Sequence, residues 1–158
     1  MSPILQLRGP RALSEFRLAK LLAALQKADP GVRAVAAEYR HFVESEAALD
    51  AGGRALLERL LDYGTAAGVE GRGEPFLVVP RLGTLSPWSS KATDIARNCG
   101  LKAVRRIERG TLFHVEGARE RAVVAALLHD RMTETVLASL DEAARLCRNL
   151  RVHPNKQD

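Results

Sequence analysis

Residues 80–100 combine a run of hydroxyl side chains with a basic residue near the start of a predicted helix. The stretch holds the only tryptophan of the chain, and the candidate site residues are Ser86, Trp88, Ser89, Ser90, Lys91, Thr93 and Asp94. Hydroxyl groups, an ammonium group and the unpaired amides of a helix N-terminus can together bind a phosphate or a carboxylate. The residues also leave a plainer interpretation open, in which the stretch is a capped turn and Trp88 fills the core.

The elements around this stretch determine how it would be presented. Residues 76–79 form a short apolar run that predicts a buried strand, and Pro80 ends it because proline donates no hydrogen bond to a sheet. Apolar residues then recur at helical spacing from Ala92 to Cys99, which predicts a helix capped by Ser89 or Ser90. The sequence therefore predicts a strand, a polar loop and a helix N-terminus that carries Lys91.

The chain consists of two similar halves. Residues 1–64 predict the order strand, helix, strand, helix, with Ser14 and Asp50 as the helix caps. A polar, glycine-rich connection at 65–75 leads to residues 76–129, where the order recurs and a bulge is expected at Gly110. Each half is too small to enclose a core alone, so residues 1–129 are predicted to act as one domain.

The predicted fold class is α/β (α+β), with two βαβα halves in a pseudo-two-fold arrangement. We expect a four-stranded, mostly antiparallel sheet with the helices packed on one side. Apolar and charged residues alternate from Val35 to Val43, which predicts a strand with one buried face. Residues 130–158 are expected to form a further helix, with Val136 in its apolar stripe, and then the start of a linker towards something beyond this chain.

Composition sets broad limits on the class of protein. The net charge of +5 comes from 24 basic and 19 acidic residues, a balance that permits binding to polyanions without specifying it. Two cysteines in unrelated contexts form no disulfide framework, which favours a cytoplasmic location. No apolar run approaches the roughly 20 residues that a membrane-spanning helix needs.

The patterns of a complete active site are absent from the sequence. There is no glycine-rich phosphate loop, the four histidines are scattered, and no His or Cys pair has the spacing of zinc ligands. The serines lack His and acid partners at the spacing of a nucleophile elbow. The sequence therefore predicts no catalytic residue, no metal ligand and no cofactor in this chain.

Several motifs resemble the N-terminal domain of the large, single-chain phosphoribosylformylglycinamidine synthase family. The most specific is the unbroken segment SPWSSKATDI at residues 86–95. Further matches follow in order along the chain, at Leu7–Gly9, Ala12–Ser14, Asn98–Gly100, Glu108–Gly110 and His129–Glu134. The resemblance covers about residues 5–150.

The resemblance implies a domain of a larger ligase of purine biosynthesis. That enzyme converts formylglycinamide ribonucleotide to the amidine with ATP and with ammonia released from glutamine. Its ATP and magnesium sites and its glutaminase triad are expected in other domains, so this chain alone is expected to be inactive. The N-terminal domain of the family is similar to a dimer of the small subunit of split enzymes, which agrees with the two halves.

The resemblance also implies the partners. They are the synthetase and glutaminase domains of the same enzyme, with no nucleic acid and no membrane; self-association of the isolated chain is left open. The contact surface is expected at the candidate residues of 86–94. A second contact is expected at Arg131 and Glu134, through hydrogen bonds that fix the entry to the linker.

A second hypothesis is a free-standing basic α/β module that binds RNA or a nucleotide. RNA-binding sheets present stacking aromatic side chains, and the strands here offer at most Tyr39, Phe42 and Phe113. Salt-dependent binding of single-stranded RNA would favour this hypothesis.

Overall fold

A computed structural model describes residues 4–66, 68, 71–81 and 86–137. The elements of the first half are β1 (Ile4–Arg11), α1 (Glu15–Ala28), β2 (Ala34–Ser45) and α2 (Ala51–Leu60). Those of the second half are β3 (Glu74–Pro80), α3 (Pro87–Asn98), β4 (Val104–Glu116) and α4 (Arg121–Leu128), followed by β5 (Glu134–Leu137). The predicted order of two βαβα halves is confirmed.

The described strands form one antiparallel sheet in the order β1-β2-β4-β3-β5. The two halves meet along its centre, where β2 pairs with β4 over twelve register positions, from Ala34 opposite Glu116 to Ser45 opposite Val104. The α+β class is confirmed, and the sheet has five described strands rather than the four predicted. The sequence predicts that the first strand ends at Arg8-Gly9-Pro10, whereas β1 runs on to Arg11.

β5 corrects the prediction of a helix after Asp130. Thr135 and Val136, both β-branched, lie opposite Val79 and Val78 and extend the sheet at the free edge of β3. The pairing is with a strand more than 50 residues away, so the local spacing of apolar residues carried no sign of it. The rest of the predicted stripe, at Leu140, Ala143 and Cys147, lies outside the described residues.

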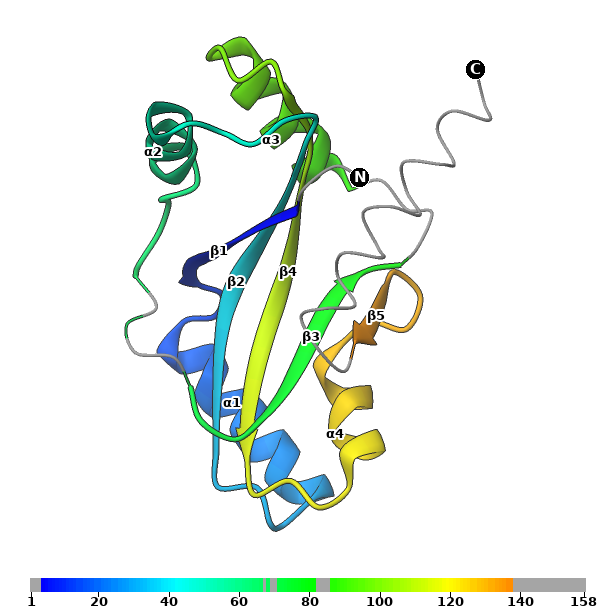
Figure 1. The fold of residues 1–158 in the computed structure, drawn as a ribbon. Helices are drawn as coiled ribbons and strands as arrows, with labels where there is room; N and C mark the ends of the chain where they lie inside the picture. Colours follow the sequence, from blue (N-terminus) through cyan, green and yellow to red (C-terminus); the bar gives the residue numbers. More distant parts are fainter. Residues whose placement is uncertain (1–3, 67, 69–70, 82–85, 138–158) are drawn as a thin grey trace.

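The described helices cover one face of the sheet in two pairs, which confirms the predicted layering. Leu25 of α1 and Val124 of α4 pack with Phe76 and Val115 at one end of this face. At the other end, α2 and α3 pack with Val43 and Ile107 in a second cluster, whose members include Leu57 and Ala96. In Figure 1, α2 and α3 gather at the upper end of the sheet and α1 and α4 at the lower end.

The opposite face is also largely buried along β2, which corrects the prediction of one buried face. Phe42 packs there with Leu77, Val79 and Leu112. Glu38, Arg40 and Glu44 lie on this face and are buried as well. Arg8 donates two hydrogen bonds of 2.8 Å to the Glu38 carboxylate, and Arg40 donates one of 2.9 Å, so the buried acid is paired.

Local capping signals place the first two helices. The Ser14 hydroxyl accepts a hydrogen bond from the backbone N–H of Arg17, and the Asp50 carboxylate accepts one from that of Gly53, as predicted. Asp29, at the end of α1, binds residues that are far away in the sequence. Its Oδ2 accepts hydrogen bonds from the backbone N–H groups of Arg119 and Glu120 at 2.7 and 2.8 Å. One carboxylate thus joins the end of α1 to the start of α4.

The predicted bulge at Gly110 is absent, since β2 and β4 pair without a register shift through this residue. A Cβ atom at Gly110 would lie 2.9 Å from Val79 Cγ1 and 3.1 Å from the carbonyl oxygen of Val78. The glycine therefore permits close packing of β3 on β4 rather than an irregular strand.

Candidate functional site

Helix α3 begins one turn earlier than the sequence predicted. Ser86, rather than Ser89 or Ser90, caps it by accepting the backbone N–H of Ser89 at 3.0 Å, and Pro87 occupies the first helical position. Lys91 consequently lies in the second turn and is exposed. Of the first three helical positions, Pro87 therefore has no N–H to donate and the Ser89 amide is bound by Ser86.

Two of the candidate hydroxyl groups attach α3 to the edge of β4. The pairing of β3 with β4 stops at Val78 opposite Thr111, so β3 does not cover Ile107. The Ser89 hydroxyl donates to the Ile107 carbonyl oxygen, and the Thr93 hydroxyl accepts the Ile107 backbone N–H at 3.0 Å. Ser89 and Thr93 therefore replace a neighbouring strand at this position.

Trp88 belongs to a group of five side chains that we call the aromatic–arginine cluster: Tyr39, His41, Tyr63, Trp88 and Arg109. They come from β2, from the segment after α2, from α3 and from β4. His41 stacks on Trp88 with ring centroids 5.6 Å apart and an interplanar angle of 16°. The Arg109 guanidinium lies 4.2 Å from the Tyr39 ring centroid and 4.5 Å from that of Trp88. Cation–π attraction of this kind holds the arginine on the rings.

Hydrogen bonds link the same groups. Tyr63 Oη accepts from Arg109 Nη1 at 3.2 Å and lies 2.8 Å from His41 Nε2. The tyrosine hydroxyl can donate to His41 Nε2 or accept from it, and His41 Nδ1 is buried without a hydrogen-bond partner among the described residues. Gly9 of β1 covers this ring closely, since a Cβ atom there would lie 2.6 Å from His41 Cε1.

The electrostatics of the cluster favour neutral rings beside one fixed positive charge. Burial, together with the charge of Arg109, lowers the pKa of His41 to about 4. Burial raises the pKa of Tyr63 above its ordinary value, although Arg109 partly opposes this shift. His41 and Tyr63 are therefore both uncharged at neutral pH, and Arg109 supplies the charge of the cluster.

The remaining candidates of α3 lie at the surface. Ser90, Lys91 and Asp94 are exposed, and neither Lys91 nor Asp94 makes an ion pair with a described residue. Lys91 borders a small apolar pocket of about 150 Å³ between α2 and α3, together with Trp88 and Tyr63. Lys91 and Trp88 thus line the same pocket, whereas the hydroxyl groups of Ser89 and Thr93 form hydrogen bonds within the fold.

Arg131 and Glu134 lie elsewhere, at the end of β3. Glu134 is paired opposite Pro80, and its carboxylate accepts the backbone N–H of Asp130 at 2.9 Å. Arg131 is exposed in the turn between these acids. The role predicted for both in the entry to a linker stays a prediction.

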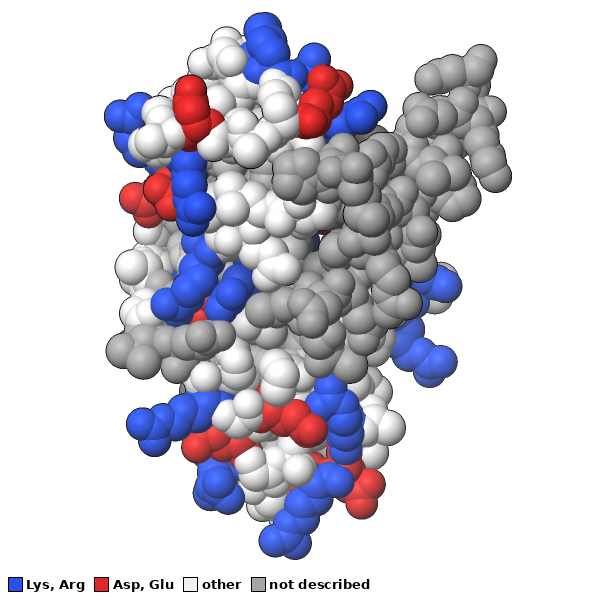
Figure 2. All heavy atoms as spheres, viewed as in Figure 1, with Lys and Arg blue, Asp and Glu red and all other residues white. Residues whose placement is uncertain are grey.

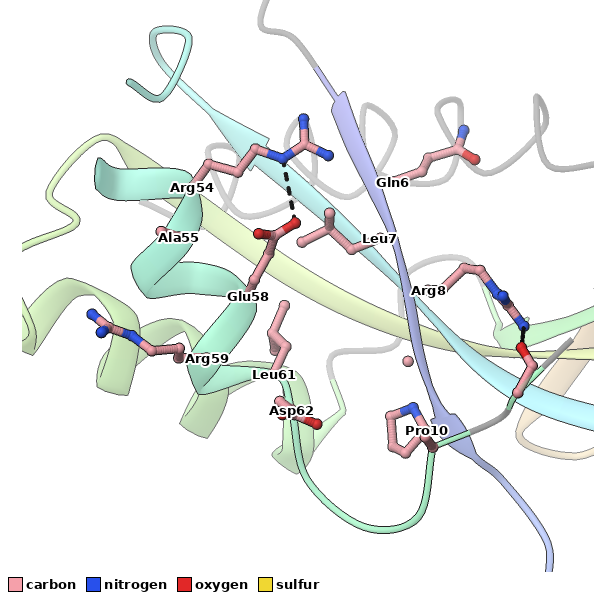
Figure 3. A pocket seen from close by; sticks show the side chains of 13 residues that line it. Gln6, Leu7, Arg8, Pro10, Arg54, Ala55, Glu58, Arg59, Leu61 and Asp62 are labelled. Atoms are coloured by element: carbon pink, nitrogen blue, oxygen red, sulfur yellow. Dashed lines mark hydrogen bonds and ion pairs between the residues drawn. The ribbon is translucent and has the colours of Figure 1, made fainter. Parts of the chain in front are cut away.

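A larger groove of about 960 Å³ lies between β1 and α2. Leu7 points towards α2 across it, whereas Gln6 and Arg8 point to the other side of β1 (Figure 3). Arg54 pairs with Glu58 at 3.5 Å, and Arg8 pairs with Glu38 at 2.8 Å. The described residues that line the groove include no Ser, Thr, Cys, Lys or His, and Glu58 and Asp62 are the only carboxylates among them. This lining offers no pair of a nucleophile and a base.

Charged groups are otherwise spread over the surface. Basic and acidic side chains lie side by side at both ends of the face in Figure 2, and a run of basic side chains follows the β1 side. Within the part of the chain that the structure describes, no three His, Cys, Asp or Glu side chains gather as metal ligands. No described helix is long and apolar enough to cross a membrane.

Sequence analysis missed most of the aromatic–arginine cluster. Trp88 and the run around it were singled out, but Tyr63 and Arg109 carry no local signal of their own. These residues come together only in the folded chain. His41 lies opposite Arg109 in the sheet, and α3 packs against that part of the sheet. The nearest clue in the sequence is the likeness between residues 40–44 and 112–116 near the ends of the two long strands.

A family model matches most of the chain. The model of the family described as formylglycinamide ribonucleotide amidotransferase N-terminal matches residues 38–147, well over half of the 158 residues. The matched region contains most of β2, all of α3 and β4, and every member of the aromatic–arginine cluster.

Proposed function

Because this chain belongs to the formylglycinamide ribonucleotide amidotransferase N-terminal family, we propose that it acts as the interface domain of that amidotransferase. In this role it holds the synthetase and glutaminase domains together and supports the transfer of ammonia between them. The family match over residues 38–147 is the observation that carries the proposal. The chain itself performs no covalent step.

The contacts of the candidate side chains support a structural role over a catalytic one. Ser86 caps a helix, and Ser89 and Thr93 bind the backbone of β4, so these three hydroxyl groups are committed within the fold. A serine nucleophile would need a base within hydrogen-bond reach and an oxyanion site beside it. The hydrogen bonds of these hydroxyls go instead to backbone groups and, for Ser86, to Glu108 at 3.5 Å.

The chemistry of the reaction explains why such a domain would be useful. Ammonia released into water at neutral pH is mostly protonated, and ammonium has no lone pair with which to attack an activated amide. Transfer between two active sites therefore requires a path closed to water. We expect ATP and magnesium to bind in the synthetase domain, and this chain to complete the contacts that keep the path closed.

The exposed face of α3 is the proposed contact surface. Ser90, Lys91 and Asp94 present a hydroxyl, a cation and an anion on a helix that is firmly attached to β4. Replacing Lys91 and Asp94 by Ala in the whole enzyme should lower glutamine-dependent activity more than activity with ammonium salts. The matched control is Lys27→Ala, an exposed lysine on α1 at the other end of the helix-covered face. Equal effects on both ammonia sources would contradict this placement.

The test of the proposed function is complementation in trans. The 158-residue chain is added to a fragment that contains the synthetase and glutaminase domains, and amidine formation is followed with glutamine and then with ammonium salts. Recovery of glutamine-dependent activity is the expected result. A folded chain that neither binds the fragment nor restores this activity would refute the proposal.

The RNA-binding hypothesis has less support. Of the three strand aromatics that it relied on, Phe42 and Phe113 are buried, with 0% and 6% of their surface exposed. Only Tyr39 is partly accessible, and Arg109 already lies against its ring. Stacking on bases needs open ring faces.

A further inference from the structure

Arg109 differs from the other arginines that lie within this fold, because no described carboxylate pairs with it. Arg8 and Arg40 pair with Glu38, and Arg106 pairs with Glu108. Arg109 is half-buried against Tyr39 and Trp88, and its one side-chain hydrogen bond to a described residue goes to Tyr63 Oη. A guanidinium group has five N–H donors, so most of them are left for another acceptor.

The immediate neighbours of Arg109 leave its charge uncompensated. His41, opposite it in the sheet, is neutral, and the Tyr63 hydroxyl is protonated. The adjacent Glu108 points to the other face of the sheet, since side chains alternate along a strand, and Arg106 binds its carboxylate there. The cluster therefore presents a positive charge that is partly shielded from water by rings on which it is fixed.

The geometry favours a carboxylate over a phosphate. Phosphate sites commonly use the free amides of a helix N-terminus, but in α3 the Ser86 hydroxyl binds the Ser89 amide and Pro87 has no N–H. A planar guanidinium matches the two oxygens of a carboxylate. Tyr, Trp and Arg are also the residues that most often anchor protein interfaces, because rigid rings lose little entropy on binding. All three types meet here, and all are partly accessible.

We propose that the aromatic–arginine cluster is a docking site that receives an Asp or Glu side chain from another domain of the same enzyme, with Arg109 as its anchor. This inference rests on the proposed function, since it names the part of the interface domain that another domain of the enzyme contacts. Tyr39, Tyr63 and Trp88 form the walls of the site and hold the guanidinium in place for the incoming carboxylate.

The experiment uses Trp88 as an internal reporter, because it is the only tryptophan of the chain. The 158-residue chain is labelled with 5-fluorotryptophan, and the unlabelled fragment with the synthetase and glutaminase domains is titrated into it. We expect the single ¹⁹F resonance to shift on binding. Arg109→Gln should weaken the Kd at least tenfold, and Arg109→Lys, which keeps the charge but loses the fork, should weaken it less.

The matched control is Arg105→Gln, an exposed arginine on the same strand whose only described partner is Glu46 at 3.9 Å. It should leave the Kd unchanged. Circular dichroism and the Tm establish that each variant is folded, and if Arg109→Gln is not, Arg109→Lys carries the comparison. Acetate, inorganic phosphate and Mg-ATP are titrated into the chain alone at constant ionic strength.

The outcomes separate this inference from the proposed function. Normal binding of the fragment with no shift of the Trp88 resonance, or with an unchanged Kd for Arg109→Gln, overturns the docking site and leaves the interface role standing. Saturable binding of phosphate or Mg-ATP that requires Arg109 also overturns it, because the cluster would then hold a small anion. No binding of the fragment at all refutes both.

Discussion

At the scale of single residues, Glu38 and His41 show two ways in which this fold accommodates a buried ionisable group. Burial alone would raise the pKa of Glu38, but hydrogen bonds and charge from Arg8 and Arg40 outweigh it and lower the pKa. His41 shows the opposite solution, because it is fully buried beside a cation and stays neutral. Charge is thus either paired or removed by a change in protonation.

This neutral histidine makes stability depend on pH. In the unfolded chain His41 should titrate near its ordinary pKa of 6.5, whereas in the folded protein burial and Arg109 lower the pKa to about 4. Between these values the unfolded state binds a proton that the folded state does not, so the free energy of unfolding falls as the pH falls from 6.5 to 4. The loss from this residue is at most about 3 kcal/mol, and its slope fades as the pH rises above 6.5, because the unfolded chain then also loses the proton.

Urea unfolding followed by Trp88 fluorescence between pH 4 and 7.5 measures this slope. His41→Phe keeps an aromatic ring beside Trp88 but cannot bind a proton, so its curve should be flatter than that of the wild type. The carboxylates Asp29 and Glu38, whose pKa values are also lowered, titrate in both proteins and cancel in the difference. Parallel curves for the two proteins would show that His41 is not the titrating group.

At the scale of elements, α3 takes the place of a strand beside the upper part of β4. Removing the Thr93 hydroxyl would leave the Ile107 backbone N–H without its acceptor, and removing that of Ser89 would leave the Ile107 carbonyl oxygen without its donor. A buried backbone group that loses its partner costs about 1–3 kcal/mol. Thr93→Val and Ser89→Ala should therefore each lower the free energy of unfolding by about that amount.

Chemical denaturation with circular dichroism measures both changes. Ser90→Ala, in the same turn but exposed, is the matched control and should change the stability by less than about 0.5 kcal/mol. If all three variants were equally stable, α3 would owe its position to Trp88 and Ala96 rather than to the hydroxyl bonds.

The elements also show how far the sequence could predict this structure. The caps at Ser14 and Asp50 were predictable because each is a bond between residues three apart. The strand β5 and the extension of β1 were not, because distant strands induce them. The Pro87 start of α3 could have been found from the preference of proline for the first helical position. The role of Arg109 could not, since it requires residues from four separate segments.

At the scale of the whole molecule, the two halves share one fold but neither has a core of its own. The offset that aligns residues 40–44 with 112–116 also aligns Tyr39 with Thr111, and these two residues lie opposite each other in the central pair of strands. The pseudo-two-fold relation predicted from the sequence therefore centres on the β2–β4 pairing. The aromatic–arginine cluster includes Tyr39 and therefore lies at this centre.

Both apolar clusters on the helix-covered face draw on both halves. One joins Leu25 and Ala37 of the first half to Phe76 and Val124 of the second. The other contains Val43, Leu57 and Ile107. A half by itself would expose its side of each cluster and the unpaired edge of β2 or β4. Chains of that size are only marginally stable even with a complete core, and a half of this chain would lack part of its core.

Cutting the connection between the halves tests this account. We expect a chain of residues 1–66 and a chain of residues 71–158 to be largely unfolded separately, and to regain the sheet and helix signal in circular dichroism when mixed. The transition should depend on concentration, because association and folding become one step. The Tm of the mixture should be lower than that of the intact chain, because bringing two separate chains together costs entropy.

The control is the substitution Val43→Asp in the first chain. It should abolish assembly, because it places an unpaired charge in a cluster to which both halves contribute. A first half that folds alone with a cooperative transition would show instead that the repeat is two independent domains.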